Sequence, residues 1–232
     1  MEISLTLETR QGTSPLNFAY DRMANAGYVG RDQEEVRRHI EELARKGIPG
    51  PKTTPTLYPV IRRALITDSE IEVYGEETCG EVEYVLLVKD ADSVYVGLGS
   101  DHTDRHLEET DIPRAKQICP NIICPTVWLF SEVREHWDSL VLESWVIRDG
   151  EKILYQQGSL ELIMAPEALM EFVGGKVKRP LERFIIFSGT LGLVTGEFVF
   201  GDEFIARLRD PVLGRSLNLR YSIHPLDYVD PD

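Results

Sequence analysis

Between residues 71 and 221 the sequence consists largely of short runs of β-branched and aromatic residues, separated by turn-forming residues. Runs of about four to eight such residues, bounded by Gly, Pro, Asn or Asp, are typical of β-strands. Asp149 and Gly150 separate two of the runs, and an Asp-Gly pair favours a tight hairpin turn. The sequence therefore predicts a strand-dominated fold. The predicted strands are residues 81–88, 93–98, 141–147, 152–156, 184–187, 197–200, 203–208 and 216–221.

Few helices are expected beside these strands. The clearest covers about residues 32–46, where Asp32 is a candidate N-cap and Glu35 follows three residues later. Gly47 comes next, and glycine is common just beyond the C-terminus of a helix. Two shorter helices are predicted at residues 132–137 and 166–172.

The organisation of the chain indicates one structural unit. At its start Ile3, Leu5 and Leu7 alternate with polar residues, which predicts a further strand. No internal repeat, low-complexity tract or linker-like segment divides the sequence. We therefore expect residues 1–232 to form a single mixed α/β domain in which strands dominate.

Charge and composition restrict the expected partners. The formal net charge is −14, whereas nucleic acids and anionic membranes are bound by basic surfaces, so neither is expected to be a partner. An anionic substrate is still compatible with this charge, because a bound metal can reverse the field inside one pocket. No run approaches the ~20 apolar residues of a membrane-spanning helix, and no signal-like apolar segment follows Met1, so we expect a soluble cytoplasmic protein. The cysteines lack metal-binding or disulfide spacing and are expected to be reduced and packed. They are Cys79, Cys119 and Cys124.

Glu81 and Glu83 lie two residues apart in a predicted strand, so their carboxylates project from the same face. Like charges this close repel each other unless a cation lies between them or one carboxyl keeps its proton. Two oxygen donors on one rigid element suit Mg²⁺, Mn²⁺ or Ca²⁺ better than zinc. The alternative interpretation is the solvated polar face of an edge strand.

A dense polar segment follows the strand that contains Gly97 and Gly99. Glycines at the end of a strand allow a close approach, and binding sites are often built at such ends. Asp101 could supply a third oxygen ligand, and Arg105 could hold a substrate carboxylate with its forked guanidinium. Alternatively, Asp101 caps a short helix that begins at His102.

His39 and Glu42 lie three residues apart in the predicted helix and are therefore neighbours at the margin of its apolar stripe. A histidine beside a glutamate can share a proton with it and activate water as a general base. The alternative is ordinary pairing on the helix surface, where Glu42 is also four residues from Arg38 and from Lys46.

Two further positions are candidates for contacts with an anion. Lys116 has small and apolar neighbours, which indicates partial burial, and a buried ammonium needs an anionic partner. Gly189 and Thr190 follow a predicted strand, so their backbone N–H groups and the threonine hydroxyl could bind an anionic oxygen. The sequence contains neither a Walker motif nor a dinucleotide-binding fingerprint.

Taken in order, these motifs resemble the catalytic domain of the fumarylacetoacetate hydrolase superfamily, in a short branch of it. That domain has a helix with His-x-x-Glu, a strand with Glu-x-Glu, a turn that contains an Asp and an Arg, a lysine, and a Gly-Thr turn. The similarity covers about residues 25–222. The matching residues here are His39, Glu42, Glu81, Glu83, Asp101, Arg105, Lys116, Gly189 and Thr190.

The resemblance implies a β-sandwich or β-roll with few helices, assembled as a homodimer. It also implies that Glu81, Glu83 and Asp101 hold magnesium or manganese. Family members bind 2-oxo acids or 1,3-dicarbonyl compounds through this metal, and they include acylpyruvate hydrolases, oxaloacetate decarboxylases, and isomerases and hydratases of aromatic catabolism.

The roles of the other matching residues are likewise implied by the resemblance. His39 and Glu42 would activate water, and Lys116 would stabilise a developing oxyanion or a substrate carboxylate. Arg105 and Thr190 would orient the substrate. The residues that flank these motifs differ from the family pattern, so the substrate stays open.

The expected function is metal-dependent hydrolysis of a carbon–carbon bond in a small 2-oxo acid or 1,3-dicarbonyl compound of the acylpyruvate type. Decarboxylation, isomerisation or hydration of an oxo acid on the same site is the first alternative. A ligand-binding homologue without catalytic activity is the second.

Overall fold

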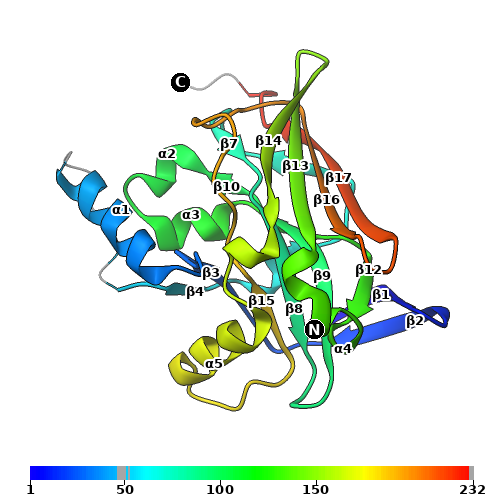
Figure 1. The fold of residues 1–232 in the computed structure, drawn as a ribbon. Coiled ribbons are helices and arrows are strands. Elements are labelled where there is room, and N and C mark those ends of the chain that lie inside the picture. The colour runs from blue at the N-terminus through cyan, green and yellow to red at the C-terminus, as the bar shows by residue number, and fades with distance from the viewer. Residues whose placement is uncertain (46–50, 52, 230–232) are drawn as a thin grey trace.

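The computed structural model describes residues 1–45, 51 and 53–229, and the strands in these ranges form two large sheets (Figure 1). The main path of the larger sheet is β2-β1-β12-β9-β8-β15-β3-β4, and β11 pairs with both β9 and β5. Most neighbours are antiparallel, but β1 pairs with β12, β3 with β15 and β5 with β11 in parallel. Its strands are β1 (Glu2–Thr9), β2 (Gly12–Ala19), β3 (Arg22–Gly27), β4 (Thr56–Pro59), β5 (Leu65–Ile66), β8 (Val82–Val88), β9 (Val94–Asp101), β11 (Asn121–Ile123), β12 (Thr126–Leu129) and β15 (Phe184–Phe187).

This larger sheet is rolled. Asn25 of β3 and Asn121 of β11 are separated by four strand pairings, which would place them roughly 19 Å apart in a flat sheet. Instead the Asn121 amide donates a hydrogen bond to the Asn25 side-chain oxygen at 3.2 Å. The inward-facing side chains of the roll, including Val85, Leu87 and Phe187, form one apolar cluster. The β-roll expected from the resemblance is therefore present.

The second sheet packs against the outer face of β8 and β9. Its order is β14-β13-β16-β17-β6. Leu86 and Leu98 of the roll share one buried apolar cluster with Leu142, Phe204 and other residues of this sheet. β8 lies between two cores, and all seven of its residues are buried. The strands of the second sheet are β6 (Glu70–Val73), β13 (Val141–Arg148), β14 (Glu151–Ser159), β16 (Glu203–Asp210) and β17 (Arg215–Pro225). A separate two-stranded pair joins β7 (Thr78–Cys79) to β10 (Thr103–Asp104).

The helices are few and mostly short (Figure 1). The predicted N-cap of the longest is confirmed, because Asp32 Oδ1 accepts the Glu34 backbone N–H at 2.9 Å. Gly47, predicted just beyond the C-terminus of this helix, lies outside the described residues. No helix in the described part of the chain is long and apolar enough to cross a membrane. The helices are α1 (Gln33–Arg45), α2 (Arg105–Glu108), α3 (Ile112–Ile118), α4 (Phe130–Val133) and α5 (Pro166–Lys176), with 3-10 turns η1 (Arg62–Ala64), η2 (Arg134–Ser139) and η3 (Leu160–Leu162).

Most of the predicted strands are present, with one correction. The Asp-Gly turn joins β13 to β14, and both of its residues have the positive φ of a type I′ hairpin, 54° at Asp149 and 79° at Gly150. The strand predicted at residues 197–200 is wrong, because these residues, all of them described, form a loop. Their alternation has another cause, since Phe198 and Phe200 both line a cleft.

Candidate metal centre

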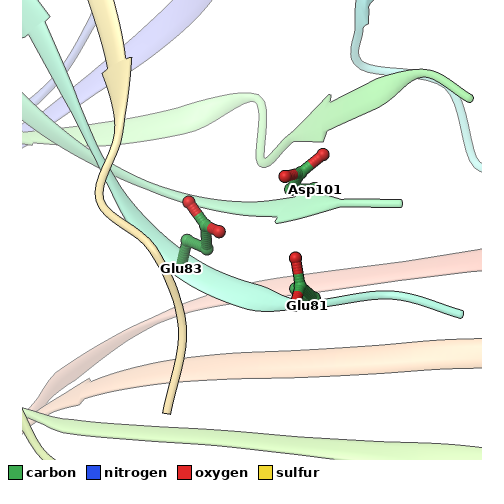
Figure 2. A group of neighbouring side chains, drawn as sticks. All are labelled: Glu81, Glu83 and Asp101. Carbon is green, nitrogen blue, oxygen red and sulfur yellow. The ribbon is translucent and has the colours of Figure 1, made fainter. Parts of the chain in front are cut away.

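Three carboxylates converge where β8 and β9 lie side by side. Glu81 immediately precedes β8, Glu83 is its second residue, and Asp101 ends the antiparallel neighbour β9. The Asp101 N–H donates to the Glu81 carbonyl oxygen at 3.1 Å, which ties the two backbones together. One carboxylate oxygen from each residue lies within 4.8 Å of the others, and the side chains point toward a common centre (Figure 2). The structure therefore brings the three predicted ligands together.

Two buried cations neutralise part of this charge. The Lys116 ammonium lies 2.7 Å from Glu81 Oε2 and 2.8 Å from Asp101 Oδ2. The Arg105 guanidinium lies 3.1 Å from Glu81 Oε1 and 2.6 Å from Glu108 Oε2. The predicted need of Lys116 for an anionic partner is thus met by two of the three carboxylates.

The pKa values show that the neutralisation is uneven. Burial alone would raise the pKa of Glu81, but the charges of Arg105 and Lys116 lower it to about 2. Burial and the charges of Asp101 and Glu81 raise the pKa of Glu83 well above its ordinary value. Burial also raises the pKa of Asp101, which Lys116 offsets only in part. The two cations therefore favour the ionised form of Glu81, whereas the ionised forms of Glu83 and Asp101 are only partly compensated.

The residues present fit a divalent cation. Asp101 Oδ1 is buried and has no hydrogen-bond partner among the described residues. Glu83 Oε2 accepts the Gly189 backbone N–H at 2.8 Å, which holds that carboxyl in place. Three carboxylate oxygens are a donor set that suits Mg²⁺ or Mn²⁺ rather than a soft metal. A cation at this point would satisfy the orphaned oxygen and relieve the repulsion between the carboxylates.

Both alternative interpretations of these acidic residues are wrong. β8 is not an edge strand, because it lies between β9 and β15, and Glu83 is only 1% exposed. Asp101 does not cap the helix that follows it. Asp104 does so instead, since its Oδ1 accepts the Leu107 N–H at 2.9 Å.

The prediction that a strand ends at Gly97 and Gly99 also needs correction. The strand continues through both glycines to Asp101 and does not end there. A Cβ at Gly99 would lie 2.6 Å from Phe187 Cε1 and 2.7 Å from Val85 Cγ2. The close approach that this glycine permits is therefore that of core side chains inside the roll.

The Arg105 side chain is held by contacts with other side chains of the protein. Besides its two carboxylate partners, its Nε donates to Cys79 Sγ at 3.0 Å, and the Phe198 ring covers the guanidinium at 4.4 Å. The side chain is buried. In this arrangement Arg105 fixes Glu81 and Glu108, and its predicted contact with a substrate carboxylate stays a prediction.

The Thr190 hydroxyl is likewise hydrogen-bonded to other groups of the protein. Its hydroxyl donates to the Val82 carbonyl oxygen at 2.7 Å and accepts the Gln156 amide at 2.6 Å. These bonds attach the loop after β15 to the start of β8. The oxygen that the Gly-Thr turn binds in the structure is a carboxyl oxygen of Glu83, through the Gly189 N–H.

The predicted catalytic pair lies in α1, but the side chains of His39 and Glu42 lie outside the described residues. Other residues of α1, including Val36, Arg38 and Ile40, line the same cleft as Glu81 and Glu83. The prediction that His39 and Glu42 activate water therefore stays a prediction.

Glu81 and Glu83 line a cleft of about 1770 Å³. Tyr28 lies on its wall, is 37% exposed and has a φ of 57°, which is unusual for an aromatic residue. Sequence reasoning missed Tyr28, Glu108 and Gln156. Glu108 could have been found, because it lies three residues after Arg105 on one helical turn. The buried Gln156 comes from the other sheet, so nothing in its local sequence marks it.

The cysteines agree with their prediction. All three are free and buried, in the part of the chain that the structure describes. They are Cys79, Cys119 and Cys124.

Comparison with known proteins supports the family resemblance. A family model described as protein of unknown function (DUF2848) matches residues 26–221. No curated protein matches the sequence. Solved structures do match, and the descriptions of two of them name fumarylacetoacetate hydrolase family proteins.

Three of these structures show the extent of the similarity. A protein from Yersinia pestis CO92 assigned to the fumarylacetoacetate hydrolase family has a TM-score of 0.65 and 18% identity, over 93% of this chain and 99% of that chain. Yeast ynq8, of the same family, has a TM-score of 0.63 and 16% identity, over 92% of this chain and 97% of that chain. A 2-keto-3-deoxy-D-arabinonate dehydratase complexed with magnesium and 2,5-dioxopentanoate has a TM-score of 0.63 and 14% identity, over 94% of this chain and 78% of that chain. The chain therefore has the fold that the sequence resemblance predicted.

Proposed function

Because this chain belongs to the family described as protein of unknown function (DUF2848) and has the fold of fumarylacetoacetate hydrolase family proteins, we propose that it is a metal-dependent enzyme of oxo-acid chemistry. The proposed reaction is hydrolysis of a carbon–carbon bond in a small 2-oxo acid or 1,3-dicarbonyl compound. The observation that carries the proposal is the convergence of three carboxylates, one with an orphaned buried oxygen, beside a cleft that Glu81, Glu83 and Lys116 line.

Glu81, Glu83 and Asp101 would hold the cation, which we propose is Mg²⁺ or Mn²⁺. When bound, such a cation polarises the carbonyl oxygen of a 2-oxo acid, a contribution typically worth several kcal/mol. The magnesium and 2,5-dioxopentanoate bound by the structurally similar dehydratase support both the metal and the class of substrate.

Lys116 is the residue that we assign to charge stabilisation. Its ammonium is held at the centre by Glu81 and Asp101 and by the Thr103 hydroxyl at 3.0 Å, and it lines the cleft. A positive charge fixed in a buried site stabilises negative charge as it develops on a substrate oxygen. Arg105 would contribute by keeping Glu81 ionised and aligned, and Thr190 by holding the loop beside Glu83.

His39, assisted by Glu42, is the proposed general base. It would take a proton from a water molecule whose oxygen adds to the distal carbonyl carbon of the substrate. The carbon–carbon bond then breaks, its electron pair stays with the 2-oxo-acid fragment, and that fragment takes up a proton. The products are a carboxylic acid and a smaller 2-oxo acid, so water is the only other reactant.

The alternatives differ in what water does. Without attack of water, the same binding of an oxo acid permits decarboxylation or isomerisation, whereas a hydratase would add water across a carbon–carbon double bond and leave the carbon–carbon bond intact. Acylpyruvates, fumarylpyruvate-like acids and oxaloacetate, assayed with Mg²⁺ or Mn²⁺, separate these reactions. Formation of a carboxylic acid and pyruvate in equal amounts supports hydrolysis. Release of carbon dioxide from oxaloacetate, without cleavage of any acylpyruvate, would favour the decarboxylase, and binding without turnover would favour a non-catalytic homologue.

We also propose that residues 1–232 act as one catalytic domain. The site draws on β8 and β9 of the roll, on α3 through Lys116, and on Gln156 of the second sheet. Limited proteolysis that separates the two sheets while metal binding persists would contradict this assignment. The homodimer expected from the resemblance is tested by light scattering during gel filtration.

A further inference from the structure

A buried chain of hydrogen bonds lies behind the metal centre. Ser100 and His102 flank Asp101 in the sequence, and along a strand such neighbours point to the face opposite Asp101. Ser100 Oγ and His102 Nδ1 lie 2.9 Å and 3.0 Å from the same Tyr221 hydroxyl. At the other side of the imidazole ring, His102 Nε2 lies 3.0 Å from Thr78 Oγ1. None of the four side chains is more than 3% exposed.

The hydroxyl groups of this hydrogen-bonded network pack against the backbone of Gly80, the residue before Glu81. A Cβ on Gly80 would lie 2.6 Å from the Tyr221 hydroxyl oxygen and 2.7 Å from Ser100 Oγ. Only a glycine therefore lets the segment before Glu81 lie directly on these hydroxyl groups. The network thus contacts the residue before Glu81 and both neighbours of Asp101.

The network also connects separate elements. Tyr221 belongs to β17 of the second sheet, Thr78 to β7, and Ser100 to β9 of the roll. β7 pairs with β10, the strand directly after His102. The relative position of Glu81 and Asp101 therefore depends on contacts with a sheet that contributes no carboxylate to the centre.

We propose that Tyr221, with Ser100, His102 and Thr78, forms a positioning network that holds Glu81 and Asp101 at the separation a divalent cation requires. The inference rests on the proposed metal site. Groups that orient metal ligands from behind typically change metal affinity about 10- to 100-fold when they are removed. Here the network orients the backbone that carries the ligands, and it does not touch the carboxylate oxygens.

The hydrogen-bonding capacities of the four groups are consistent with a fixed network. If His102 Nδ1 donates to Tyr221, the Tyr221 hydroxyl donates to Ser100 and Nε2 accepts from Thr78. In the other tautomer every bond reverses, and each group again has a partner. Removal of the Tyr221 hydroxyl breaks the chain in both directions, whereas phenylalanine keeps the ring contacts with Phe204 and His102.

Titration calorimetry of the full chain with Mn²⁺ alone tests the proposal on Tyr221→Phe. The matched control is Tyr20→Phe, which removes another buried hydroxyl, one that donates to the Arg62 carbonyl oxygen at 3.1 Å away from the cleft. We expect Tyr221→Phe to weaken Mn²⁺ binding at least about tenfold and Tyr20→Phe to leave it within twofold. Chemical denaturation of both variants without metal shows whether their losses of stability are comparable.

Ser100→Ala provides the second variant, because it removes one hydroxyl at the edge of the network and serves if Tyr221→Phe does not fold. Weaker Mn²⁺ binding in either variant, with native circular dichroism, supports the inference. Wild-type affinity in Ser100→Ala and in folded Tyr221→Phe overturns it and leaves the proposed function intact. Absence of Mn²⁺ binding in the wild-type chain would instead refute the proposed function and the inference with it.

Discussion

Replacement of Lys116 by methionine removes the ammonium from the carboxylate cluster and keeps a side chain of similar length. The ammonium contacts Glu81 and Asp101 at 2.7 Å and 2.8 Å, and the Lys116 side chain is only 8% exposed. Loss of one partner from a buried ion pair costs roughly 3–5 kcal/mol, because the remaining charge stays buried without compensation. The substitution leaves the negative charges of Glu81 and Asp101, and of Glu83 beside them, without the compensating ammonium charge.

For a chain of this size, 1 kcal/mol changes the melting temperature by about 2–4 °C. We therefore expect Lys116→Met to melt on the order of 6–20 °C below the wild type in EDTA. Saturating Mg²⁺ should restore much of that loss, because a divalent cation replaces the missing positive charge. Ligand at about 100 times its dissociation constant stabilises by about 2.7 kcal/mol, and the gain should be larger in the variant than in the wild type.

Differential scanning calorimetry in EDTA and in Mg²⁺ measures both effects. Lys178→Met is the control, because Lys178 is exposed and a surface substitution should change stability by less than about 0.5 kcal/mol. Equal melting of Lys116→Met and wild type in EDTA would refute the buried ion pairs. A Mg²⁺ shift no larger than that of the wild type would refute the idea that ammonium and cation compensate the same carboxylates.

Three further predictions concern the same region. Glu83→Gln should stabilise the metal-free protein at neutral pH, because it removes a buried carboxyl with a raised pKa and keeps an acceptor for the Gly189 N–H; urea denaturation measures this effect. The same substitution should abolish Mg²⁺ binding, which titration calorimetry measures. Because the folded pKa of Glu83 is raised, the stability linked to its proton is present at low pH and falls as the pH rises through the folded pKa. Saturating Mg²⁺ should abolish this slope, and urea denaturation at a series of pH values with EDTA or Mg²⁺ would contradict the reasoning if the two slopes were equal. Gly99→Ala should destabilise the chain by about 1–3 kcal/mol, since its Cβ would lie 2.6 Å from Phe187 and 2.7 Å from Val85; an unchanged urea midpoint would show that the roll can adjust.

Local patterns in the sequence predicted the parts of the fold that depend on neighbouring residues. The hairpin at Asp149 and Gly150 follows from their tolerance of positive φ, and the shared face of Glu81 and Glu83 follows from strand alternation. In contrast, β3 (Arg22–Gly27) contains no β-branched residue, so its sequence does not predict a strand. It is a strand because β15 and β4 bind it on both sides.

The candidate site likewise contains residues that local sequence predicts and residues that it does not. The carboxylates could be proposed from spacing and family resemblance, because β8 and β9 are consecutive strands and meet after one short turn. Tyr221 could not be proposed, since it follows Ser100 by 121 residues and reaches the site only when the second sheet packs on the roll. Gln156 was missed for the same reason, as it holds Val82 from 74 residues away. Such contacts depend on the packing of the two sheets, which local periodicity does not reveal.

The central claim is that Glu81, Glu83 and Asp101 bind one divalent cation together. Equilibrium dialysis against Mn²⁺, followed by elemental analysis, measures this directly in the wild type and in Asp101→Asn. The prediction is one Mn²⁺ per wild-type chain and almost none in the variant, with identical circular dichroism. Equal metal in both samples, or none in the wild type, would contradict the claim.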